Sequence, residues 1–64
     1  MIKEYDIVKA VKDLNDKVKE GSEGTVLMVY PDFPSVYEIE FFDEMKESLD
    51  VLTVQVDDLI KVNS

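Results

Sequence analysis

Hydrophobic and polar residues alternate along the chain in short runs that predict β-strands. The clearest run places Tyr37, Ile39 and Phe41 on one side of a strand. Glu38 and Glu40 fall on its other side. Because successive side chains of a strand point to opposite faces, this pattern predicts a strand with an apolar face in the core and an acidic face in solvent.

The preceding strand is predicted at residues 25–30, which are almost continuously apolar. Such a run is typical of a central strand that is covered on both faces, or of one whose outward residues support a neighbour. Residues 31–35 follow as a turn, and neither Pro31 nor Pro34 can donate a backbone hydrogen bond. A stiff connection is therefore expected between the two strands.

The C-terminal part of the chain predicts a further strand and a short closing element. A charged hairpin connection is expected at residues 43–48, followed by a strand at 49–56. In that strand Leu52, Val54 and Val56 share one face, opposite Val51, Thr53 and Gln55. After it we expect a helical turn at residues 57–59 with Asp57 as its cap, and a last short strand at 60–62.

Residues 5–14 fit two secondary structures. A helix would place Ile7, Val8, Val11 and Leu14 on one face, whereas a strand would place Val8 and Ala10 inward. The β-branched residues favour a strand. The helix remains the alternative.

Residues 15–24 are polar and predict a loop that ends in a sharp turn. Gly21 and Gly24 lie three residues apart just before the apolar strand, and glycine adopts positive φ at little cost. Val18 is the lone apolar residue of this segment. We expect it to fix the loop to the core.

The order of these elements predicts an all-β fold, a small SH3-like barrel of about five strands with one short helical turn before the last strand. At 64 residues, the chain is expected to form a single domain over residues 1–64. A domain of this size needs nearly all of its large apolar residues for packing, which leaves few for a pocket.

Composition narrows the possible functions. The chain has no cysteine and no histidine, so thiol nucleophiles, disulfides and the usual zinc sites are excluded. Fifteen acidic residues against seven lysines give a net charge of −8, which opposes nucleic-acid binding and favours a partner with a basic surface. No stretch predicts a signal peptide or a membrane span. We therefore expect a cytoplasmic protein without cofactors, although the acidity could serve solubility alone.

Five short motifs are spread along the chain: Asp6-Ile7-Val8, Gly21-Ser22-Glu23-Gly24-Thr25-Val26, Tyr37-Glu38-Ile39-Glu40-Phe41-Phe42-Asp43, Leu52-Thr53-Val54 and Asp57-Asp58-Leu59. Together they resemble a bacterial family known as domain of unknown function 4926. The resemblance covers nearly the whole chain and implies a compact β-barrel, but no activity. The turn at residues 31–34 is bulkier than the glycine-containing turn of that family.

Three kinds of chemistry are disfavoured. Residues 21–26 resemble the start of the KOW motif of ribosomal and transcription proteins, but the adjoining loop is not basic, and the glycines have a sufficient structural role. The acidic clusters lack the spacing of a calcium loop. Glu38 and Glu40 could support acid–base catalysis only with a cleft and a raised pKa, neither of which the sequence indicates. We expect no enzyme activity and no metal site.

A protein-binding patch is the favoured hypothesis. Aromatic and acidic residues of the two central strands and their connections could form a surface with an apolar centre and an acidic rim. Alternatively, Phe33 and Phe42 cover an open end of the barrel. The candidate partner-binding residues are Tyr30, Phe33, Glu38, Glu40, Phe42, Asp43 and Glu44.

Two further interpretations stay open. The first strand or residues 60–62 could pair as an edge with another chain and give a homodimer. The acidic surface could also mimic nucleic acid in an inhibitor of the antitoxin, immunity or anti-CRISPR type. Such an inhibitor would bind a basic partner in competition with nucleic acid and would be strongly sensitive to salt.

Overall fold

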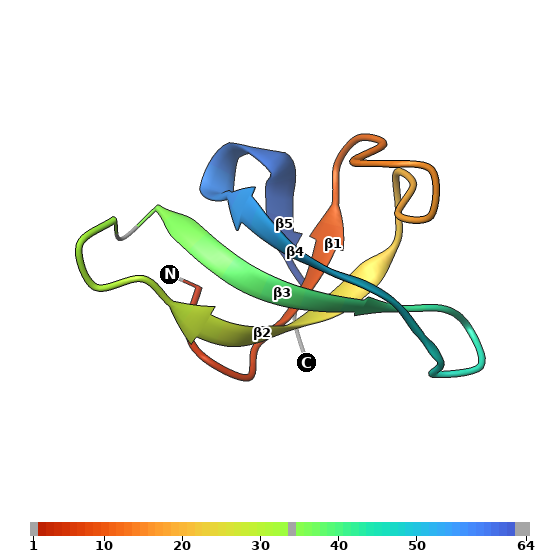
Figure 1. Ribbon diagram of the computed structural model, residues 1–64, viewed down its shortest axis with the longest axis horizontal. Coiled ribbons are helices and arrows are strands. Elements are labelled where there is room, and N and C mark those ends of the chain that lie inside the picture. Colours follow the sequence, from red (N-terminus) through yellow and green to blue (C-terminus); the bar gives the residue numbers. More distant parts are fainter. Residues whose placement is uncertain (1, 34, 63–64) are drawn as a thin grey trace.

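The protein folds into one antiparallel sheet of five strands that curls into an SH3-like barrel (Figure 1). The computed structural model describes residues 2–33 and 35–62. The order of strands in the sheet is β4-β3-β2-β1-β5. The elements are β1 (Ile7–Ala10), β2 (Glu23–Val29), β3 (Val36–Phe42), β4 (Ser48–Gln55), the 3-10 turn η1 (Val56–Asp58) and β5 (Leu59–Lys61).

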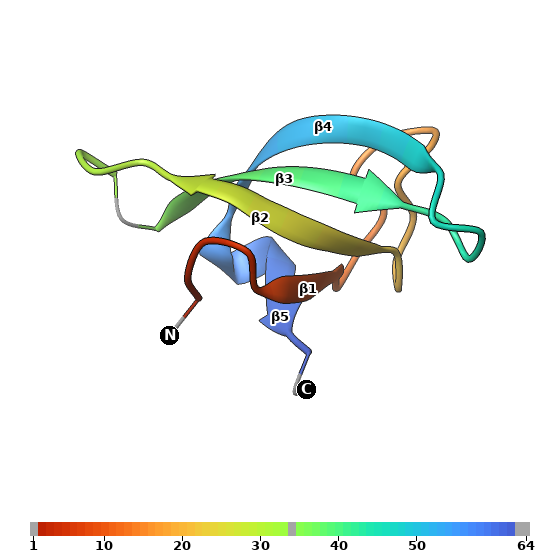
Figure 2. The ribbon, with the colours of Figure 1, turned by 90° about the horizontal axis from the view of Figure 1, so that it is seen from below.

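The curl brings β1 and β5 to lie across from β3 and β4, as Figure 2 shows. The core fills the space enclosed by this curl. Phe41 and Ile39 are its largest completely buried side chains. The buried apolar residues are Val8, Ala10, Val18, Val26, Tyr37, Ile39, Phe41, Val54 and Leu59.

Strand β3 confirms the predicted alternation. Its residues alternate between half-buried and buried from Val36 to Phe42, with Tyr37, Ile39 and Phe41 in the core. β3 pairs with β2 on one side and β4 on the other. Its apolar face therefore anchors the core, and its second face carries the acidic residues.

The structure has a β-strand, β1, within residues 5–14, so the helix alternative for this segment was wrong. It spans only Ile7–Ala10, and its inward residues are Val8 and Ala10, as predicted. β1 pairs with β2 on one side and with β5 on the other. The expectation that the first strand is an open edge was wrong as well, because β5 covers that side.

Strand β2 (Glu23–Val29) differs from its prediction at residues 25–30 in its start, its end and its coverage. It begins at Glu23, so Gly24 belongs to the strand and is buried, whereas Gly21 provides the turn with φ of 90°. The strand is also not covered on both faces, since Leu27 and Met28 are 38% and 39% exposed. A bulge between Val26 and Met28 shifts the register and leaves these two side chains on the outer surface.

The loop between β1 and β2 is fixed to the barrel by Val18, which is completely buried as predicted. Asn15 organises the loop from within. Its Oδ1 accepts hydrogen bonds from the backbone N–H groups of Lys17 and Val18, at 2.9 and 2.7 Å. Its Nδ2 donates to Asp50 Oδ2 in β4 at 3.0 Å. One asparagine thus connects the loop to the opposite side of the barrel.

The chain closes through η1 and β5, with small corrections to the predicted bounds. Asp57 lies inside the 3-10 turn and is not its cap. Gln55 occupies the cap position and makes no side-chain capping bond. β5 begins at Leu59, one residue earlier than predicted, because Leu59 is the residue that pairs with Ala10 of β1.

Asp6 fixes the N-terminal segment to the start of β1. Its Oδ2 accepts a hydrogen bond from Lys3 N–H at 2.8 Å and lies 3.4 Å from Lys61 Nζ of β5. The backbone N–H of Lys3, aided by the positive charge of Lys61, lowers the pKa of the Asp6 carboxyl below its ordinary value. The ionised carboxylate therefore favours the folded state.

This lowered pKa predicts a pH-dependent stability with a definite sign. An unfolded aspartate has a pKa of about 3.9, so the contribution of Asp6 is present above that pH and disappears as the pH falls through the lower pKa of the folded state. We expect Asp6→Asn to flatten the acid side of the curve of unfolding free energy against pH, measured by urea unfolding between about pH 2 and 6. Asp16→Asn, at an exposed position, is the control. Equal flattening by both variants would contradict the assignment.

Candidate functional site

The outer surface of β2, β3 and β4 brings Glu38 and Glu40 together. We call this surface the acidic face. Antiparallel pairing places Glu40 between Thr25 of β2 and Val51 of β4. One row further along, Glu38 lies opposite Met28 and Thr53. Both glutamates are half-buried, since their neighbours on the flanking strands cover part of each side chain. The acidic face consists of Thr25, Leu27, Met28, Tyr30, Glu38, Glu40, Val51 and Thr53.

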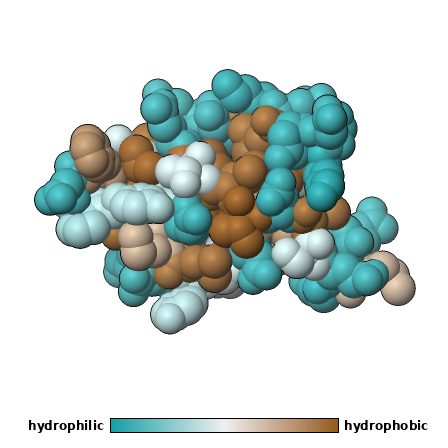
Figure 3. All heavy atoms as spheres, in the orientation of Figure 1, coloured by the Kyte–Doolittle hydropathy of each residue, from teal (hydrophilic) through white to brown (hydrophobic). Residues whose placement is uncertain are grey.

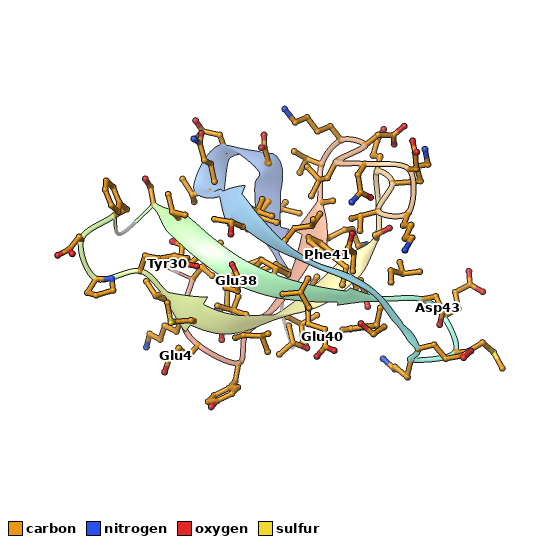
Figure 4. All side chains as sticks on the ribbon, viewed as in Figure 1. Glu4, Tyr30, Glu38, Glu40, Phe41 and Asp43 are labelled. Carbon is orange, nitrogen blue, oxygen red and sulfur yellow. The ribbon has the colours of Figure 1, made fainter. Side chains whose placement is uncertain are left out.

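Hydrogen bonds hold the carboxylate of Glu38 in place. Its Oε1 accepts from Tyr30 Oη at 3.2 Å and from Thr53 Oγ1 at 2.7 Å. Figure 4 shows Tyr30 beside Glu38, with Glu40 further along β3. Residues two apart in a strand are separated by roughly 6.6 Å. The face therefore presents two carboxylates from alternate positions of β3, and the carboxylate of Glu38 is oriented by its neighbours.

The charge of this face is uniformly negative. The three strands β2, β3 and β4 contain no lysine, while they carry four acidic residues, Glu23, Glu38, Glu40 and Asp50. Among these, Asp50 is engaged with Asn15, as described above. A cation that approaches Glu38 and Glu40 therefore meets no competing positive charge from these strands.

The predicted arrangement of an apolar centre inside an acidic rim was wrong, because the two are reversed. The glutamates lie on β3, the middle strand of the three, and apolar side chains lie on the strands at either side. Leu27 and Met28 are on β2, and Val51, which is 43% exposed, is on β4. Figure 3 shows hydrophobic surface across the middle of this view, interrupted by hydrophilic patches. Aliphatic groups thus flank the carboxylates.

Phe42, Asp43 and Glu44 were predicted to share the patch but lie at the far end of β3. Figure 4 shows Asp43 and Tyr30 at opposite ends of that strand. Asp43 has a structural role, since its Oδ1 accepts hydrogen bonds from the N–H groups of Met45 and Glu47 at 2.8 and 3.0 Å. It shapes the β3–β4 hairpin, in which Lys46 adopts φ of 66°. One oxygen of its carboxylate is therefore occupied within the hairpin.

This hairpin borders an open cleft of about 860 Å³ with mixed charge. The loop before β2 forms the opposite wall. Lys9, Lys17 and Lys46 line the cleft together with four acidic residues. Lys46 Nζ lies 4.7 Å from the centre of the Phe42 ring, a cation–π contact. Phe42 is half-buried, and the ammonium group of Lys46 lies over its ring.

Phe33 lies at the tip of the β2–β3 connection and is 65% exposed. The alternative in which Phe33 and Phe42 cover an open end of the barrel was wrong, because one is exposed and the other lies at the far end of β3. The turn itself is hydrogen-bonded, from Phe33 N–H to Tyr30 O and from Val36 N–H to Phe33 O. Pro34, which was expected to stiffen it, lies outside the described residues.

Thr53 is a site residue that sequence reasoning missed. The sequence pattern predicts only that it shares a strand face with Val51 and Gln55. The register of β3 and β4 places it opposite Glu38, where its hydroxyl can orient the carboxylate. A threonine in an outward position is a weak signal, and only the strand register identifies its partner.

Two features are absent from the described residues. Residues 2–33 and 35–62 hold no group of three or more acidic, histidine or cysteine side chains arranged to bind a metal ion. The same part of the chain forms no helix of the length and apolarity that a membrane crossing requires.

The fold and this surface define a small SH3-like barrel protein with an acidic sheet face. The chain belongs to the family described as Domain of unknown function (DUF4926), whose model matches residues 4–61. This confirms the resemblance found in its motifs. No curated protein and no solved structure was found to match the chain.

Proposed function

We propose that this protein is a non-enzymatic interaction module that binds a basic surface of a partner protein through the acidic face. The observation that supports this function is the pair of carboxylates on β3, held within three strands that contain no lysine. Complementary charge increases association rates and disfavours partners of the wrong sign. Binding of this kind needs no cofactor and fits a cytoplasmic protein.

The geometry favours cations that carry an apolar stem. Lys and Arg side chains place aliphatic carbons along apolar surface while their charged ends reach an acid. Leu27, Met28 and Val51 provide such apolar surface beside Glu38 and Glu40. Glu38 is already oriented by two hydrogen bonds, which reduces the entropy lost when a cation binds it.

The test neutralises the two glutamates without changing their shape. In Glu38→Gln/Glu40→Gln the amide oxygen can still accept from Tyr30 and Thr53, so the face keeps its structure. We expect basic proteins captured from host extract by the wild type to be retained at least about tenfold less by this variant, measured by quantitative mass spectrometry.

The matched control is Glu4→Gln/Asp16→Asn, which changes the net charge by the same amount at exposed positions outside the acidic face. This control is expected to capture the same proteins as the wild type. Equal loss of capture in both double variants would show that only net charge matters. Undiminished capture by the variant of the acidic face would refute the proposed site.

An inhibitor that mimics nucleic acid is the second candidate, supported by the same row of carboxylates. Such a protein would be displaced from its partner by nucleic acid, and its binding would weaken steeply with salt. The apolar flanks of the acidic face favour the first candidate, because contacts with Met28 and Val51 are not screened by salt. Competition with a DNA duplex at low and moderate salt separates the two.

A further inference from the structure

Among residues 2–33 and 35–62, the open edge of β4 is the longest strand edge without a neighbour in the sheet. β4 is an outer strand and pairs with β3 along one side only. It has eight residues, whereas β5, the other outer strand, has three. β4 also contains neither proline nor lysine, the residues that commonly protect exposed edges from pairing with another chain.

The backbone of β4 alternates between groups that bond β3 and groups that face the open edge. Val56 N–H donates to Ser35 O at 2.8 Å, just beyond the paired strands. Successive residues of a strand direct their N–H and C=O groups to opposite sides. The N–H group of Val54 therefore points to β3, as that of Val56 does. The N–H groups of Thr53 and Gln55 point to the open edge.

The first half of this edge is already occupied. Asp50 Oδ1 accepts a hydrogen bond from Val51 N–H at 2.8 Å, and Asp50 Oδ2 is held by Asn15. Within the described part of the chain, no side chain plays this role for Thr53 N–H or Gln55 N–H. The open half of the edge is therefore its second half.

A groove of about 500 Å³ lies beside this second half. One wall is formed by the edge of β4, including Leu52, Thr53 and Gln55. The loop after β1 forms the opposite wall, with Leu14 and Asp13. Leu14 and Leu52 are half-buried and pack against the core, so this part of the groove is apolar.

Charge around the groove favours a basic occupant. The one lysine that lines it, Lys12, forms an ion pair with Asp58 at 3.2 Å and is thereby neutralised. Asp13 adds a negative charge on the far wall. On the outer side, Thr53 connects the edge directly to the carboxylate of Glu38. A second copy of this chain would bring a net charge of −8 and a β4 without lysine, so it is not the favoured occupant.

We propose that the edge of β4 at Thr53 and Gln55 binds an extended segment of a partner protein in which apolar residues alternate with Lys or Arg. The segment adds as a sixth strand. Its apolar side chains point toward Leu14 and Leu52, and its cationic side chains point outward toward Glu38. This inference rests on the proposed function, because it specifies how a basic partner reaches the acidic face.

Gln55→Pro tests the edge without disturbing the fold. Gln55 has φ of −84°, within reach of proline, and the N–H that is lost points away from β3. Gln55→Ala, which keeps this N–H, is the matched control. The probe is an acetylated and amidated hexapeptide that alternates lysine and valine. We expect it to bind Gln55→Pro about three- to tenfold more weakly than Gln55→Ala, and to protect the Thr53 and Gln55 amides of the wild type from hydrogen exchange.

Three results would overturn the inference: no binding of the peptide by the wild type, equal affinities of the two variants at position 55, or protection that occurs only on self-association. Urea unfolding of both variants verifies that they are folded. The glutamine variants of the acidic face separate the two proposals. If these variants weaken binding of the peptide but Gln55→Pro does not, the acidic face is supported as the binding site and strand addition is refuted. In the opposite case the edge binds and the proposed acidic face fails.

Discussion

Phe41→Ala is expected to remove a large fraction of the protein's free energy of unfolding. Phe41 is completely buried and is the largest such side chain of the core. Truncation of a buried phenylalanine to alanine typically costs about 3–5 kcal/mol. At about 0.05–0.15 kcal/mol per residue, the entire stability of a domain of this size is roughly 3–10 kcal/mol. One substitution therefore removes a large fraction of the stability. In so small a core, few other side chains can move to fill the cavity that the Phe41 ring leaves.

Phe33→Ala is the matched control, since it removes the same atoms from a side chain that is 65% exposed. We expect it to change the free energy of unfolding by less than about 0.5 kcal/mol. Thermal and urea unfolding, followed by circular dichroism, measure both variants. A loss of less than about 1 kcal/mol for Phe41→Ala, or similar losses for the two variants, would contradict the assignment of Phe41 to the core.

Gly24→Ala is expected to lower the free energy of unfolding by about 1 kcal/mol, although alanine normally stabilises a strand relative to glycine. A Cβ atom at Gly24 would lie 2.6 Å from Ile39 Cγ2 and 3.0 Å from both Glu40 O and Phe41 Cδ1. The backbone oxygen cannot move without breaking the pairing of β2 with β3. Overpacking of this kind costs about 1–3 kcal/mol, more than the roughly 0.5–1 kcal/mol that alanine contributes through backbone entropy.

The nearest clash can be relieved separately, which gives a direct check of the cause. Ile39→Leu removes Cγ2 and conserves volume, so the double variant with Gly24→Ala is expected to recover at least about 0.5 kcal/mol in a double-mutant cycle. Gly21 provides a contrast, because a Cβ there meets nothing within 4 Å and only its φ of 90° opposes substitution. Asparagine tolerates positive φ, so it should be accepted at position 21 and rejected at position 24. Additive effects in the cycle would refute the steric explanation.

Much of the fold was predictable because strand periodicity is a local property. The alternation through Tyr37, Ile39 and Phe41 fixes which face of β3 is buried, whatever its neighbours are. The lone apolar Val18 in a polar loop likewise indicates a core contact. For the first strand, four paired residues are too few to separate strand from helix by pattern, and only the pairing with β2 and β5 decides it.

The sequence by itself determined an all-β barrel, a buried face for β3, and a net charge of −8. Tertiary structure alone decided which outward residues meet. Strand register places Thr53 and Met28 on either side of Glu38, and it separates Asp43 from Tyr30 by the length of β3. It also leaves the edge of β4 open and covers that of β1. The physical reason is that side-chain direction depends on a residue's own strand, whereas neighbours across a sheet depend on pairing between distant parts of the chain.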